Sequence, residues 1–132
     1  MLLRAPAAVG DVLDRITILA HKLTKVTGAA AENVRRELEA LEATWTDSGL
    51  ADPRLDPEYG PLDVVNRALW AVEDRLRSYE AEGDFGAPFV ADARSVYQLN
   101  DRRAALKRAV NLRLGSTLVE EKIHPGYGGR HA

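Results

Sequence analysis

Residues 64–80 read VVNRALWAVEDRLRSYE, and this stretch decides the fold. Apolar side chains recur through it at alternating steps of three and four residues: Leu62, Val65, Leu69, Val72, Leu76 and Tyr79. Such a seam predicts a helix with one face against a core. A second stripe beside it mixes an amide, an indole and both signs of charge: Asn66, Trp70, Glu73 and Arg77. The first stripe predicts the fold, and the second offers candidate functional residues without naming a reaction.

Three more helical segments accompany this one. Asp11 is a start signal for the first, Gly28 is expected to end it, and the Pro- and Gly-containing residues 47–61 predict a loop. The predicted helices cover about 9–27, 29–46, 61–82 and 87–114, with a tail at 115–132. We predict an all-α fold, an antiparallel four-helix bundle built from two helical hairpins, as a single domain over residues 1–132.

The composition excludes several classes of protein. The chain has 132 residues, of which 45% are hydrophobic and 29% charged, as in one globular domain. It has no cysteine, which rules out disulfides and thiolate chemistry. A net charge of −2 disfavours nucleic acid as a partner, and no stretch approaches the ~18 apolar residues of a membrane span. We expect a cytoplasmic protein that binds neither nucleic acid nor membranes.

The fourth helix carries a face that is apolar at both ends and polar in the middle: Phe89, Ala93, Val96, Asn100, Arg103, Lys107, Val110 and Leu114. Either the helix turns its core face towards Leu99 and Leu106, or it presents the polar residues inward. In the second case Arg103 and Lys107 need a nearby anion, because an isolated buried charge is very costly. The anion can come from the chain (Asp14, Glu73, Asp74 or Glu80) or from a ligand.

Two functional hypotheses follow from this face. In the first, the helices bind an anionic small molecule through its phosphate or carboxylate group. The candidate ligand-binding residues are Asn66, Trp70, Tyr97, Asn100, Arg103 and Lys107, with Glu73 and Asp74 as candidate catalytic bases or counter-ions. In the second, the polar residues form a structural network in a non-catalytic accessory subunit that docks onto a biosynthetic partner enzyme. Exposed apolar residues near the loops (Leu50, Leu55 and Phe85) are compatible with a homodimer, and whether the protein is an enzyme stays open.

No metal site or cofactor is expected. The carboxylates lack the dense paired motifs of magnesium-dependent helical hydrolases. His21, His124 and His131 are scattered, and His21 is predicted at the surface or at the rim of a site. The run Glu120-Glu121-Lys122 is either a solvated tail or folds back to give carboxylates to Arg103 or Lys107.

Several segments together resemble a family of small uncharacterised bacterial helical proteins. They are Gly10…Asp14-Arg15…Thr17-Ile18-Leu19, Asn33…Arg35, Val65-Asn66…Leu69-Trp70…Glu73-Asp74, Ala93-Arg94-Ser95-Val96-Tyr97, Asn100-Asp101…Arg103-Ala104…Lys107 and Glu120-Glu121-Lys122. The resemblance spans most of residues 9–122. It implies genes placed near those for glycosyltransferases and surface polysaccharides, and hence a biosynthetic setting, but it carries no reaction. It also favours a functional site, because the shared residues are polar and fall on the inner stripes.

Overall fold

The computed structural model describes residues 1–126, which hold four α-helices, one short 3-10 helix and no strand. The helices are α1 (Val9–Leu23), α2 (Gly28–Asp47), α3 (Tyr59–Glu82) and α4 (Ala87–Arg113), and η1 (Pro53–Leu55) lies between α2 and α3. No helix in this range combines the length and apolar character that crossing a membrane requires.

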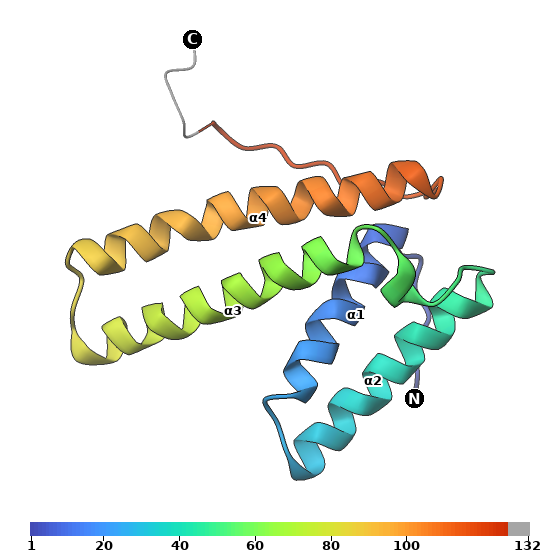
Figure 1. Ribbon diagram of the computed structural model, residues 1–132, viewed down its shortest axis with the longest axis horizontal. Helices are drawn as coiled ribbons and strands as arrows, with labels where there is room; N and C mark the ends of the chain where they lie inside the picture. Colours follow the sequence, from blue (N-terminus) through green and yellow to red (C-terminus); the bar gives the residue numbers. More distant parts are fainter. Residues whose placement is uncertain (127–132) are drawn as a thin grey trace.

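The helices form two antiparallel hairpins of unequal length (Figure 1). The shorter hairpin, α1 and α2, is inclined against one end of the longer hairpin, α3 and α4. α1 lies at the centre, because it packs on α2 and also on both α3 and α4. The predicted all-α bundle of two helical hairpins, with the third and fourth helices longest, is confirmed.

The core lies where the two hairpins meet. Half of its buried members come from α1, and the complete set is Val12, Leu13, Ile16, Leu19, Leu38, Trp45, Leu62 and Val110. Val12, Ile16 and Leu19 recur at steps of four and three residues, and Leu13 lies in the neighbouring row. Burial of such a stripe, more than helix propensity, holds a helix of 15 residues in place.

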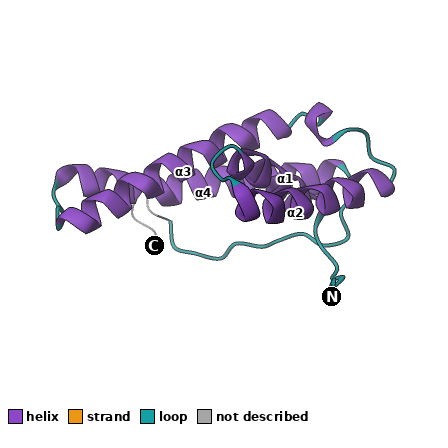
Figure 2. Cartoon of the chain, turned by 90° about the horizontal axis from the view of Figure 1, so that it is seen from below, coloured by secondary structure: helices purple, strands orange, loops and turns teal. Residues whose placement is uncertain are grey.

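The far end of the long hairpin extends past α1 and α2 (Figures 1 and 2). We call residues 73–99 the arm. None of its residues is buried, whereas Val72 just before it is. Within the arm the two helices hold each other through Tyr79 and Phe89, whose rings meet edge to face at 6.4 Å, and through Arg75 and Asp92, whose Nε and Oδ2 atoms are 2.9 Å apart.

The first helix begins at Val9, as predicted, but it ends earlier than predicted and lacks its predicted cap. It stops at Leu23 rather than near residue 27, because Thr24 Oγ1 donates to the carbonyl of His21 and competes with the helical ladder. Gly28, expected to end this helix, instead begins α2 with a φ of 63°. Asp11 was expected to cap α1, but Ala8 occupies the cap position and Asp11 pairs elsewhere.

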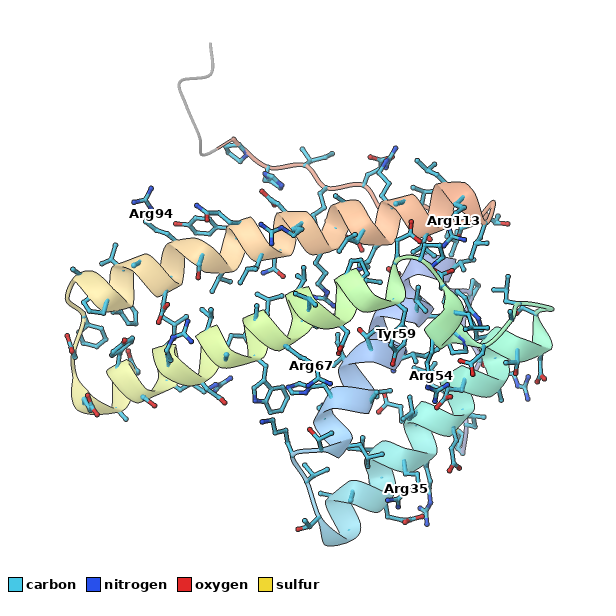
Figure 3. The ribbon with its side chains drawn as sticks, in the orientation of Figure 1. Arg35, Arg54, Tyr59, Arg67, Arg94 and Arg113 are labelled. Atoms are coloured by element: carbon cyan, nitrogen blue, oxygen red, sulfur yellow. The ribbon has the colours of Figure 1, made fainter. Side chains whose placement is uncertain are left out.

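The loop between the hairpins is tied to the end of α4. Arg113 Nη2 lies 2.7 Å from carboxylate oxygens of both Asp56 and Glu58 (Figure 3). These bonds raise the pKa of Arg113, and the hydrogen bond with Asp56 contributes most. The contact also explains why α3 begins at Tyr59, two residues before the predicted start: Asp56 accepts from the amide of Glu58 and turns the chain into the helix.

Candidate functional site

Asp14 is the centre of a buried polar cluster. Its carboxylate, 1% exposed, projects from α1 towards α3 and α4. Arg103 on α4 donates to both oxygens, from Nε at 2.9 Å and from Nη2 at 2.5 Å. Asn66 on α3 donates from Nδ2 to Oδ1 at 2.9 Å. A carboxylate bound at both oxygens by a guanidinium is a strong, oriented pair, so Asp14 joins three helices at one point.

Thr17 completes this cluster one turn further along α1. Its hydroxyl donates to the carbonyl of Asp14 at 2.7 Å and accepts from Asn66 Nδ2 at 3.0 Å. The amide of Asn66 is therefore shared between Asp14 and Thr17. We call Asp14, Thr17, Asn66 and Arg103 the Asp14 network.

Lys107 lies one turn beyond Arg103 and also finds its anions within the chain. Its Nζ is 3.1 Å from Asp11 on α1 and 3.2 Å from Glu120 in the segment after α4. The side chain is only 15% exposed. Burial alone would lower the pKa of Lys107, but the hydrogen bonds with Asp11 and Glu120 outweigh it and raise the pKa. Lys107 is thus a firmly charged cation.

These contacts settle the ambiguity of the fourth helix. It presents Arg103 and Lys107 inward, and the chain supplies the anions. Among the carboxylates considered, Asp14 is the one that holds Arg103, and it also raises the pKa of that guanidinium. The segment after α4 folds back and gives Glu120 to Lys107.

The start of α1 is packed directly onto the backbone of α4. The amide of Gly10 donates to Asn111 Oδ1 at 2.6 Å, and that of Val9 donates to Ser116 Oγ at 3.1 Å. Both are among the first amides of the helix, which have no partner within it. A Cβ at Gly10 would overlap the carbonyl oxygen of Lys107. The end of α4 and the turn after it thereby act as the cap of α1.

The other predicted site residues lie apart from the Asp14 network. Trp70 packs edge to face on His21, with 5.3 Å between ring centroids. Tyr97 and Asn100 line a pocket of about 540 Å³ between α4 and the following segment, together with His124. Glu73 and Asp74 are exposed on the arm. The structure therefore brings Asn66 and Arg103 together, with Lys107 one turn further along α4, and leaves Trp70, Tyr97, Asn100, Glu73 and Asp74 outside this cluster.

His21 is buried, whereas the sequence predicts it at the surface or at the rim of a site. It is 8% exposed, and its Nδ1 has no hydrogen-bond partner among residues 1–126. Burial lowers its pKa, as do the nearby cations Arg67 and Lys25, while Asp63 acts in the opposite direction. Figure 3 shows Arg67 reaching from α3 towards this part of α1. His21 is therefore held neutral.

A stripe on α1 could have revealed these residues from sequence. Gly10, Asp14, Thr17 and His21 follow one another at steps of four, three and four, so they share one helix face. On the opposing helix Arg103, Lys107 and Asn111 are spaced by four. Two polar stripes of this kind predict that the helices meet along them.

Residues 1–126 contain no group of three or more histidine and carboxylate side chains arranged to hold a metal ion. His131 lies outside the described residues.

The fold and the cluster define a small all-α protein in which a buried ionic network joins two helical hairpins. The chain belongs to the family of unknown function DUF6165, whose model matches residues 3–128. No curated protein and no solved structure matches it.

Proposed function

We propose that this protein is a non-catalytic accessory subunit that binds a partner protein through the arm. The observation that carries the proposal is the absence of any buried residue from 73 to 99, although this range holds many apolar side chains. An amphipathic hairpin normally buries its apolar face, and larger exposed apolar areas are typical of interaction sites. A covering partner would complete the burial.

The Asp14 network supports a structural role for the polar residues. An anionic ligand would need Arg103, yet that guanidinium is already bound at two points by Asp14. A ligand that drew Arg103 away would leave the buried carboxylate of Asp14 without its counter-ion, which costs several kcal/mol. The network is better suited to fixing how α1 sits on α3 and α4, and so how the arm projects.

Charge indicates the chemistry of the partner. The arm carries six acidic and three basic side chains, and the acidic ones gather around the turn at Glu80, Glu82 and Asp84. Two arms side by side would place like charges together, which opposes association. We therefore propose a partner with an apolar groove and a basic rim, such as a biosynthetic enzyme, rather than a second copy of this chain.

The test uses two matched valines. Val90 lies on the arm and is 49% exposed, and Val64 lies on α3 outside the arm and is 65% exposed. The purified protein is used to isolate a partner, which is then purified and titrated against each variant. Val90→Glu should weaken binding about tenfold or more, because it places a charge in an apolar contact, whereas Val64→Glu should bind like wild type. Equal binding by both variants would refute the role of the arm.

Sedimentation of the purified protein tests the identity of the partner. A monomer is expected at micromolar concentration. A dimer that Val90→Glu dissociates would show that a second copy covers the arm, and the proposal of a different partner would then be wrong.

The structural role of the network has its own measurement. Arg103→Met should lower the free energy of unfolding by about 3 kcal/mol, the lower end for breaking a buried pair, because Arg103 stays 29% exposed. Denaturant unfolding measures this. An unchanged midpoint would show that Arg103 is not needed for the fold and would favour a ligand site there.

A further inference from the structure

The segment after α4 lies back along that helix instead of leaving it (Figure 1). Gly115, with a φ of 65°, reverses the chain. Ser116 then fixes the turn, since its amide donates to the carbonyl of Asn111 at 2.8 Å and its hydroxyl donates to that of Leu118 at 2.6 Å. We call residues 117–126 the strap.

Two ion pairs and a histidine–carboxylate contact hold the strap on α4. Glu120 lies 3.2 Å from Lys107, Glu121 lies 3.2 Å from Arg108, and His124 Nε2 lies 3.4 Å from Asp101. Arg108 and Glu121 are both exposed, and such pairs contribute little to stability, while Glu120 pairs with a half-buried Lys107 that has Asp11 as a second anion. The strap is therefore held weakly and can be displaced.

A pocket of about 260 Å³ lies between α4 and the strap. Three cations line it: Lys107, Arg108 and Lys122. Asn111, Ala104 and Ala105 form its floor, and the carboxylates of Glu120 and Glu121 complete its wall. The volume is slightly below the usual range for ligand pockets, which suits a small molecule.

We propose that this pocket binds a small dianion, a phosphate or a dicarboxylate. Its oxygens replace Glu120 and Glu121 as the partners of Lys107 and Arg108. Lys107 keeps Asp11 as a fixed counter-ion when Glu120 leaves, so it needs only one replacement anion. A guanidinium and an ammonium one residue apart suit such an anion, because arginine binds two oxygens at once and lysine provides a compact charge. The site is separate from the Asp14 network and does not depend on the arm.

The contacts of the strap predict how substitutions change the affinity of the pocket for an anion. Glu120 and Glu121 compete with the ligand, so Glu120→Gln with Glu121→Gln should bind more tightly than wild type. If each pair contributes what exposed pairs usually do, the gain is about twofold to thirtyfold. A pocket that merely tolerates an ion would show no gain beyond that of the changed net charge.

The experiment titrates inorganic phosphate and succinate into the full chain at constant ionic strength, with chloride as the reference. Binding is followed by calorimetry and by amide NMR shifts of residues 117–126, which report release of the strap. Arg108→Gln, an exposed change within the pocket, should weaken binding. Arg102→Gln removes the same charge from an exposed site outside the pocket lining and should not.

We expect the double glutamine variant to bind more tightly than wild type and the amide signals of the strap to shift on binding. Arg108→Gln should weaken binding, and Arg102→Gln should not. The comparison of phosphate with succinate names the ligand class. No binding to either wild type or the double variant would overturn the proposal. So would equal weakening by Arg108→Gln and Arg102→Gln, because that pattern reflects net charge alone.

Discussion

Gly10 lies where the backbone of α1 packs directly on the backbone of α4. Alanine usually stabilises a helix relative to glycine by roughly 0.5–1 kcal/mol. Here we expect the opposite: Gly10→Ala should lower the free energy of unfolding by about 2 kcal/mol, because the new methyl group would overlap the backbone of Lys107. Gly60→Ala is the matched control, since Gly60 is also helical and nothing lies within 4 Å of its added methyl. Denaturant unfolding of both variants measures the difference, and a neutral Gly10→Ala would contradict the close packing.

His21 makes stability depend on pH in a predictable direction. Its pKa in the folded protein is lowered from the ordinary 6.5 by burial and then by Arg67 and Lys25, against the effect of Asp63. The unfolded chain therefore binds the proton more tightly than the folded chain. The stabilising contribution is complete above pH 6.5 and is lost as the pH falls from there through the folded pKa.

The measurement is denaturant unfolding between pH 7.5 and 5. His21→Phe keeps a ring against Trp70 but cannot titrate, so its stability should fall less over this range than that of wild type. His124→Gln removes the exposed histidine of the strap and is the control variant. An identical slope in wild type and His21→Phe would show that His21 does not govern this transition.

At the scale of the helices, the sequence predicts the elements better than their contacts. The seam of α3 predicts both its existence and its buried face, because apolar spacing reports directly on burial. The first helix was predicted too long, since Thr24 can end a helix through its own hydroxyl. The sequence also predicts that Arg103 and Lys107 need anions if they face inward, one of the two orientations it allows for the fourth helix. It left their source open, because the choice of Asp14 depends on how α1 lies across α4, which no single helix pattern contains.

The arm should be the least protected part of the long helices. Only one face of each helix is covered there, and regions with few buried contacts open most readily. We expect backbone amides of residues 77–95 to exchange with solvent at least about tenfold faster than those of 62–72 and 104–112. Hydrogen exchange read residue by residue by NMR measures this. Uniform protection along α3 would mean that something already covers the arm in the purified protein.

For the whole molecule, the central position of α1 implies that the two hairpins fold as one unit. α2 rests mainly on α1, and α1 is fixed on the long hairpin by its core residues and by the Asp14 network. Without α1, α2 would lose the helix on which it packs, and the long hairpin would expose its buried face to water. A domain of this size with one shared core normally unfolds in a single cooperative transition.

The two tryptophans allow the unfolding of the short hairpin and of the long hairpin to be followed separately. Trp45 lies on α2 and donates through Nε1 to the carbonyl of Ala51, whereas Trp70 lies on α3 against His21. Trp70→Phe leaves fluorescence from the short hairpin only, and Trp45→Phe leaves it from the long hairpin only. In each variant the fluorescence midpoint in denaturant should coincide with the midpoint of helix loss followed by circular dichroism. A Trp45 signal lost well before the helices of α3 and α4 would show that the short hairpin detaches first, and the Asp14 network would then be too weak to couple the two halves.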